Sequence, residues 1–161
     1  MTMANNFTLT SNDLSGFVDQ TFVYDGFGAG GDNVSPHLGW VNPPAGTESF
    51  VVICHDAAAP GPGGWWHWCV FNLPGTTRAL ATNAAADGLP TGAVSVLNSY
   101  GDKSYGGPCP PPGDQAHPYL FTVYALKSTL ELDDTASPAM VLFMADSEIL
   151  GKASLVSYYA R

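Results

Sequence analysis

The sequence predicts a mostly β protein, on three observations. Charged residues make up 12% of the chain, which also holds 18 glycines and 13 prolines, and this composition favours turns and short strands over helices. Runs of β-branched and aromatic residues, such as Ser49–Cys54 and Leu120–Leu126, are typical of buried strands. Only Pro138–Leu150 carries a clear helix start.

The other strands follow from alternation or from apolar runs between turn residues. Phe7–Thr10 alternates and predicts an edge strand. Gly26–Asp32 is rich in glycine, but Pro36 follows where a phosphate-binding helix would begin, so we expect a loop. We predict further strands at His37–Trp40, Ser49–Cys54, Gly63–Pro74, Ala93–Leu97, Leu120–Leu126 and Ala153–Tyr159.

The predicted helix has a recognisable first turn. Ser137 is a favourable N-cap, and Pro138 suits the first helical position because its missing N–H has no helical partner there. A stripe of Met140, Val141 and Met144 should dock on the sheet.

Length and charge limit the classes of protein. A chain of 161 residues is expected to form one domain, residues 1–161, and to bury roughly 70% of its unfolded surface. The net charge is −9, with only five Lys and Arg residues. This charge opposes binding to nucleic acid and to anionic membranes, because both need basic patches.

The cysteine pattern predicts reduced thiols in a cytoplasmic protein. Cys54, Cys69 and Cys109 are scattered, and no CxxC pair exists, so we expect neither a structural zinc ion nor another cofactor. Met1–Asn6 lacks the basic and apolar regions of a signal peptide, and no apolar run reaches the length of a membrane span.

The run Gly63–Pro74 is the most informative stretch, because a single titratable residue, His67, lies among aromatic and aliphatic ones. Strict alternation would put His67 on the same face as Trp65, Cys69 and Phe71. A histidine in this setting is either a hydrogen-bonded core residue or the floor of a ligand pocket.

Two other segments favour the pocket. Asp56 follows a buried strand, where its carboxylate can cap a turn or orient an imidazole. The loop Tyr100–His117 holds four prolines and three glycines between Gly106 and Gly113. Such a stiff loop loses little entropy when it grips a ligand, although it is equally a structural Ω-type loop.

These segments together resemble the phosphatidylethanolamine-binding protein family, in particular its short bacterial and archaeal branch, the Raf kinase inhibitor-like proteins. The resemblance extends from about Phe7 to Tyr159. The matching motifs are Asn33–Trp40, Asp56–Pro60, Trp65–Pro74 and Gly107–Leu126. It implies a fold of two packed antiparallel sheets with one or two short helices, commonly assembled as a homodimer.

The resemblance also implies a small pocket for anions such as a phosphate head group. Its ligand-binding residues would be Asp56, His67, Pro111, His117 and Tyr119, with Gly107 and Cys109 in one wall and Trp66 and Trp68 as aromatic shields. Two imidazoles can donate to an anion, and a nearby carboxylate can orient one ring and raise its pKa. The family's turn near this site leads us to expect a cis peptide at Ala59–Pro60.

Two positions depart from the family pattern. Ala58 stands where a second aspartate is usual, and Pro118 stands where an arginine usually follows the loop histidine. Loss of an acid and a base together suggests that the two normally pair, so neither leaves an orphan charge here.

Three classes of function remain open. The first is non-catalytic binding of a small anionic or phosphorylated ligand, with possible regulation of a partner protein. The second is a protein-interaction module, such as a kinase inhibitor, whose pocket acts as a switch. The third is a hydrolase that uses Asp56, His67 and His117, although the chain shows no nucleophile elbow and no HExxH motif.

Overall fold

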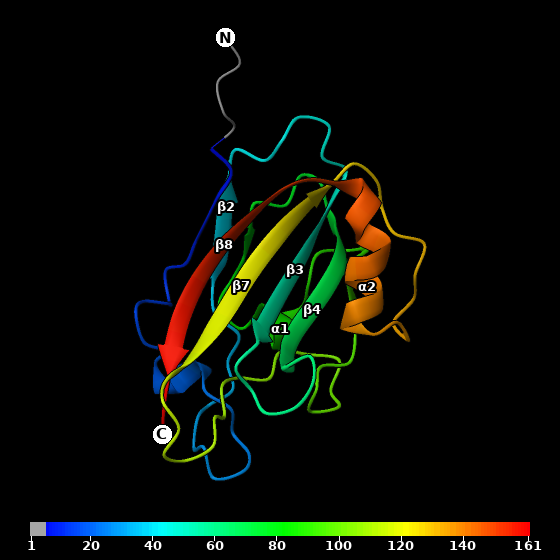
Figure 1. Ribbon diagram of the computed structural model, residues 1–161. Coiled ribbons are helices and arrows are strands. Elements are labelled where there is room, and N and C mark those ends of the chain that lie inside the picture. The colour runs from blue at the N-terminus through cyan, green and yellow to red at the C-terminus, as the bar shows by residue number, and fades with distance from the viewer. Residues whose placement is uncertain (1–5) are drawn as a thin grey trace.

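The computed structural model describes residues 6–161 and confirms the predicted fold class: two antiparallel sheets with a few short helices (Figure 1). The larger sheet has five strands in the order β6-β4-β3-β7-β8, and the smaller has three in the order β1-β2-β5. The strands are β1 (Thr8–Thr10), β2 (Leu38–Val41), β3 (Ser49–Asp56), β4 (Trp65–Pro74), β5 (Ala79–Leu80), β6 (Val94–Ser95), β7 (His117–Leu126) and β8 (Ile149–Tyr159). Residues 1–5, which include most of the segment examined for a signal peptide, lie outside this description.

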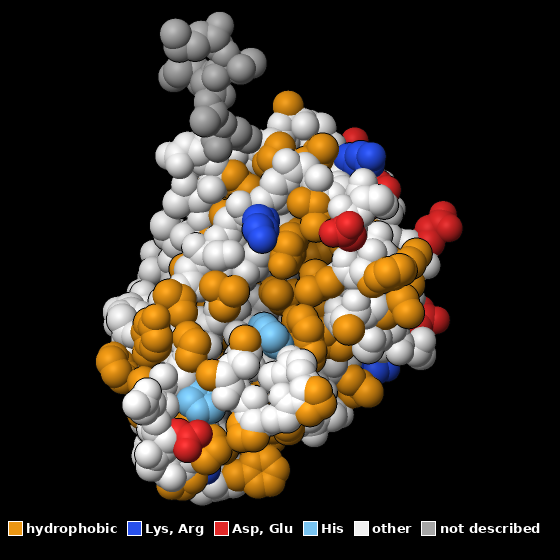
Figure 2. Space-filling model, viewed as in Figure 1, with side chains coloured by type: hydrophobic (Ala, Val, Ile, Leu, Met, Phe, Trp, Pro, Cys, Tyr) orange, Lys and Arg blue, Asp and Glu red, His pale blue; other side chains and the backbone are white. Residues whose placement is uncertain are grey.

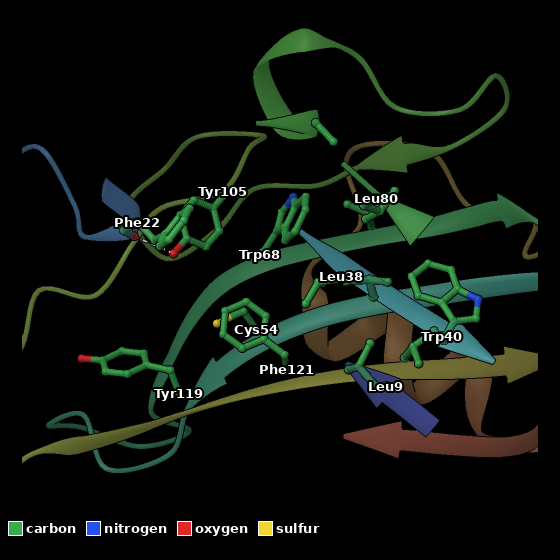
Figure 3. Packing of buried hydrophobic residues seen from close by; sticks show 14 of the residues in the cluster. Leu9, Phe22, Leu38, Trp40, Cys54, Trp68, Leu80, Tyr105, Tyr119 and Phe121 are labelled. Atoms are coloured by element: carbon green, nitrogen blue, oxygen red, sulfur yellow. Dashed lines mark hydrogen bonds between the residues drawn. The ribbon is translucent and has the colours of Figure 1, made fainter. Parts of the chain in front are cut away.

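The central strand of the larger sheet is β3, as its continuous β-branched run predicts. It pairs with β4 on one side and β7 on the other, and nearly all its residues are buried. Its alternate side chains enter two cores, because successive residues point to opposite faces of a sheet. Phe50, Val52 and Cys54 join the larger core. Val51 and Ile53 join a second core, which includes Val141 of the helix α2 (Pro138–Ala145). Figure 3 shows the larger core.

The described residues contain four short helices, and the one predicted from the sequence is shorter than expected. They are η1 (Gln20–Phe22), α1 (Ala84–Asp87), α2 (Pro138–Ala145) and η2 (Asp146–Glu148). The Ser137 hydroxyl accepts the Met140 N–H, which confirms the predicted N-cap, but the helix ends at Ala145 instead of Leu150. No helix within residues 6–161 is long and apolar enough to cross a membrane.

The predicted docking stripe of α2 is partly wrong. Val141 is buried as expected, but Met140 and Met144 are both 46% exposed. The buried residues are Pro138, Val141 and Ala145. In a helix of about two turns only one narrow row faces the sheet, and spacings of three and four residues select that row.

The strand β4 contains an irregularity that changes which side chains share a face. Cys54 pairs with Trp68, but the next residue of β3, His55, pairs with Trp66, so His67 is an extra residue on β4. Such a bulge shifts the alternation by one position. Cys69 and Phe71 therefore enter the second core, whereas the His67 ring contacts Tyr119 of the larger one. The predicted shared face of His67 with Cys69 and Phe71 is wrong, because strict alternation fails at a bulge.

The predicted cis peptide at Ala59–Pro60 is also wrong, since no cis peptide bond occurs among the described residues. The chain turns at the end of β3 without a cis peptide. The Asp56 Oδ1 accepts the Ala58 N–H at 2.9 Å, an Asx-type turn that bends the chain with trans peptides.

The proline-rich loop is fixed to the N-terminal part of the chain by close backbone packing. The Gly107 N–H donates to Asn33 Oδ1 at 2.8 Å, and the Tyr24 N–H donates to the Pro108 carbonyl at 3.0 Å. A Cβ on Gly107 would lie 2.2 Å from the Phe22 carbonyl oxygen. The close packing therefore leaves no room for a side chain at position 107, and only glycine fits there.

The substitution Gly107→Ala should lower the free energy of unfolding by about 3 kcal/mol or more, because backbone on both sides has no room to yield. Gly16→Ala is the matched control, since nothing lies within 4 Å of its Cβ position, and it should change stability by less than about 0.5 kcal/mol. Urea unfolding of both variants measures this. Equal effects of the two substitutions would contradict the packing argument.

Candidate functional site

Three strand ends of the larger sheet meet at one end of the molecule, near the label C in Figure 1. Asp56 ends β3, Trp65 begins β4 and His117 begins β7, and antiparallel pairing brings these ends together. They enclose a cavity of about 270 Å³. Its lining residues are Phe27, Asp56, Ala59, Pro60, Trp65, His67, Tyr100, Cys109, Pro110, Pro111, His117 and Tyr119.

His117 lies between two carboxylates. Its Nδ1 is 2.7 Å from Asp56 Oδ2, and its Nε2 is 3.0 Å from Asp114 Oδ2. Burial disfavours a charged ring, but the hydrogen bonds to Asp56 and Asp114 outweigh burial and raise the pKa of His117 above its ordinary value. The raised pKa favours an imidazolium, whose two N–H groups both donate to these carboxylates.

His67, in contrast, is neutral. Burial lowers the pKa of its ring to about 4, although a hydrogen bond to the Gly106 carbonyl favours the charged form. A carbonyl only accepts, so Nδ1, 2.7 Å from it, carries the proton. The neutral ring therefore has its lone pair on Nε2. The edges of Tyr119 and Tyr100 hold the ring, with centroids 5.1 and 5.7 Å away.

Two hydrogen-bond donors of the cavity lining have no partner among residues 6–161. They are the Tyr119 hydroxyl and the Trp65 Nε1–H, both buried atoms. Burial raises the pKa of Tyr119, so its hydroxyl keeps its proton. Figure 3 shows the Tyr119 hydroxyl pointing away from the packed core side chains. Unpaired buried donors are costly, and a ligand with acceptor oxygens would satisfy both.

An aromatic group and the stiff loop complete the wall. The Tyr100 ring stacks on Tyr24 with centroids 3.8 Å apart, and its hydroxyl donates to the Gly107 carbonyl at 2.7 Å. Phe27 lies at the cavity rim and is 76% exposed. The glycine-rich segment around Phe27 is thus a loop, as predicted, and contributes to the cavity.

The structure brings most of the predicted site residues together. Asp56, His67, Cys109, Pro111, His117 and Tyr119 line the cavity. Gly107 does not line it and instead supports Tyr100 from behind. Trp66 and Trp68 do not line it either: the Trp66 ring packs against His55, with centroids 4.1 Å apart, and Trp68 lies in the larger core.

Several lining residues were missed by the sequence reasoning, although some carried a signal. Trp65 lies two positions before His67, and alternation alone indicated that it shares the face of His67. Tyr100 opens the proline-rich loop, but nothing in the sequence says that its ring turns inward. Phe27 belongs to a loop, where alternation gives no guidance, and so does Asp114, which does not line the cavity but bonds His117.

The site does not resemble a metal centre. Within the described part of the chain, no group of three or more His, Cys, Asp or Glu side chains is arranged to hold a metal ion. All three cysteines are free thiols, with Cys54 and Cys69 buried and Cys109 partly buried at the cavity.

The fold and the site together define a two-sheet β protein with a small, mostly apolar cavity that contains Asp56, His67 and His117 at the ends of its central strands. The model of the phosphatidylethanolamine-binding protein family matches residues 13–160, so the chain belongs to that family.

The relatives and solved structures agree with this assignment. The chain is 41% identical over 157 residues to the Escherichia coli UPF0098 protein YbhB, covering 94% of this chain and 99% of that protein. It is 42% identical over 159 residues to E. coli YbcL, covering 95% and 87%. The crystal structure of YbcL, described as a new member of the mammalian family, superposes with a TM-score of 0.93 at 40% identity over 96% and 98% of the two chains. A Chlamydia trachomatis homologue superposes with a TM-score of 0.82 at 29% identity over 98% and 99%.

The low pKa of His67 predicts a specific dependence of stability on pH. The unfolded ring takes up a proton near pH 6.5, whereas the folded ring resists protonation until about pH 4. Stability should therefore fall as pH drops through this range, by up to about 3 kcal/mol from this group. His67→Asn keeps an N–H for the Gly106 carbonyl but does not titrate. The difference in unfolding free energy between wild type and variant, measured by urea unfolding, should shrink as pH falls.

The difference isolates His67, because all other titrating groups, including His117, are common to both proteins. A difference that stays constant between about pH 7 and about pH 4 would show that His67 is not held neutral by burial.

Proposed function

We propose that the protein binds a small anionic or phosphorylated ligand, such as phosphate or a phospholipid head group, in the cavity between His67 and His117. The observation that carries the proposal is the pair of unpartnered donors, the Tyr119 hydroxyl and the Trp65 Nε1–H, in the cavity lining. A phosphate group offers several acceptor oxygens and can take both bonds. Membership of a family named for phospholipid binding supports the ligand class.

Binding of an anion would be coupled to uptake of a proton by His67. The neutral ring presents a lone pair at Nε2, and a protonated ring would present an N–H to the ligand. The groups that act on the charge of the ring are Asp56 and His55 on β3 and the backbone of Gly106 and Gly107, and the rings of Tyr100 and Tyr119 contact it edge to face. A bound anion stabilises the imidazolium, so affinity should rise as pH falls.

The cavity suits a fragment, not a whole lipid. Its volume of about 270 Å³ lies just below the range of about 300–1,000 Å³ typical of sites for drug-sized ligands. Two or three charge-assisted hydrogen bonds, each contributing about 1.5–3 kcal/mol, support affinities from about millimolar to about micromolar. A head group would enter the cavity while any attached chain stays outside.

The proposed role is binding without catalysis. The names of the matching family and structures describe binding and not a reaction. The histidine best placed to act as a base, His67, is held against the Gly106 carbonyl, and the candidate thiol Cys109 makes only a 4.0 Å contact with the Gly26 carbonyl. Neither contact is the nucleophile–base pair that covalent catalysis requires. The free thiols support a reducing, cytoplasmic setting as part of the proposal.

A second candidate function, association with another copy of the chain, rests on an exposed apolar patch. The patch consists of Leu120 on β7, Val156 and Tyr158 on β8, and Phe17 beside Tyr158, all between 40% and 61% exposed. Figure 2 shows hydrophobic side chains gathered over this part of the sheet. A contiguous apolar surface of this kind marks an interaction site, and a flat sheet face suits a two-fold self-contact.

The ligand proposal is tested with inorganic phosphate, followed by NMR of the histidine and tyrosine rings. Wild type should show saturable shifts at His67 and His117, with tighter binding at about pH 5 than at about pH 8. Tyr119→Phe removes one donor and should weaken binding about tenfold.

Tyr124→Phe is the matched control, since Tyr124 lies on the same strand but packs toward the second core, and it should bind as wild type does. The absence of ring shifts in wild type, or equal loss of affinity in both variants, would refute the proposal.

The self-association candidate predicts a dimer in size-exclusion chromatography with light scattering. Val156→Glu should yield a monomer, because a buried carboxylate without a partner is costly. Val41→Glu, at a similarly exposed residue on β2 outside the patch, should leave the dimer intact. A monomeric wild type would exclude this candidate.

A further inference from the structure

The Asp114 carboxylate accepts a hydrogen bond from the His117 Nε2–H, which is a donor that an anion in the cavity would use. The His117 ring is buried, and its Nδ1–H is committed to Asp56, itself buried at the end of β3. The only other N–H of this ring, at Nε2, donates to Asp114 at 3.0 Å. His117 therefore has no free donor while Asp114 stays in place.

The two carboxylates that hold His117 differ in their freedom to move. Asp56 is 2% exposed and also accepts the Ala58 N–H, so it is fixed. The Asp114 side chain is 43% exposed and has no hydrogen bond other than the one to His117 among the described residues. Its backbone is held in a turn, in which its N–H donates to the Pro111 carbonyl. Rotation of one side chain into water would release the Nε2–H without movement of the loop.

We propose that Asp114 is an internal competitor of the ligand: it occupies the His117 Nε2–H in the empty site and must be displaced by the incoming anion. This inference rests on the proposed function, because it concerns the same cavity. It makes Asp114 a specificity-determining residue, because a ligand must bond the His117 Nε2–H more strongly than Asp114 does in order to bind there.

Whether a ligand can displace Asp114 depends on the acceptor groups of that ligand. An incoming carboxylate exchanges one carboxylate hydrogen bond for another and gains nothing at His117. A phosphate ion has four oxygens where a carboxylate has two, so it can bond His117, Tyr119 and Trp65 together. Wild type should therefore bind phosphate in preference to acetate, and the preference should depend on Asp114.

The experiment compares wild type, Asp114→Ala, Asp114→Asn and Glu131→Gln by calorimetric titration with inorganic phosphate and, separately, with acetate. Asp114→Ala frees the N–H, and Asp114→Asn keeps an acceptor but removes the charge. Glu131→Gln is the control for net charge: Glu131 is exposed and follows Leu130, which bonds Asn72 near the far end of β4.

The expected result is phosphate binding about tenfold tighter in Asp114→Ala than in wild type, with Asp114→Asn between them and Glu131→Gln unchanged. Acetate should bind Asp114→Ala but not wild type. The His117 ring resonances, which should move on the Asp114 substitution and again on phosphate addition, verify that the variants are folded.

The outcomes separate the two ideas. If wild type binds phosphate but folded Asp114→Ala binds it equally or more weakly, the competitor is disproved and the binding function stands. If neither protein binds phosphate, the proposed function fails and the inference fails with it. Equal tightening by Asp114→Ala and Glu131→Gln would attribute the effect to net charge and overturn the role of Asp114.

Discussion

The buried ion pair between Asp56 and His117 is the interaction on which the site depends. It joins the end of β3 to the start of β7 across the sheet, at 2.7 Å, with both side chains almost fully buried. A buried carboxylate is tolerable only when paired and hydrogen-bonded, and Asp56 has His117 on one oxygen and the Ala58 N–H on the other. Asp56 therefore fixes both the His117 ring and the turn after β3, which form two walls of the cavity.

The sequence predicted the strands well because they carry strong local signals. The runs at Ser49–Cys54 and Leu120–Leu126 are mostly β-branched or aromatic; the first begins β3 and the second ends β7. The pocket residues Asp56, His67 and His117 were found through the family resemblance, and the structure places all three around one cavity.

The details that failed depend on long-range packing. One extra residue on β4 at His67 shifts the alternation of the residues after it, up to a second irregularity between Val70 and Leu73, and no local sequence pattern predicts such a bulge. Trp65 precedes the extra residue, so it keeps the alternation and lines the cavity with His67, whereas Trp66 does not. Asp114 was overlooked because an aspartate after Gly113 looks like an ordinary turn residue. Its contact with His117, three residues on, depends on the direction in which β7 leaves the loop.

The two histidines of the cavity show how one buried site can hold opposite protonation states. His117 has two carboxylates and a raised pKa, whereas His67 has only a carbonyl partner and a pKa of about 4. Burial decides the pKa of His67, whereas at His117 the hydrogen bonds to two carboxylates outweigh burial. The cavity thus holds one imidazolium that is already paired with carboxylates and one neutral ring that can accept a proton. An arriving anion would supply the hydrogen-bond partner that His67 lacks, and it would compete with Asp114 for the Nε2–H of His117.

The rigidity of the loop explains why such a small cavity can persist with unpaired donors. The loop is held from several directions: Tyr24 bonds the Pro108 carbonyl, Asn33 bonds Gly107, and Arg161 bonds the Pro110 carbonyl at 2.6 Å. Collapse of the wall onto Tyr119 would break these bonds and leave their own donors and acceptors unpaired. The donors therefore remain unpaired, and a ligand that bonds them meets a wall that needs no further ordering.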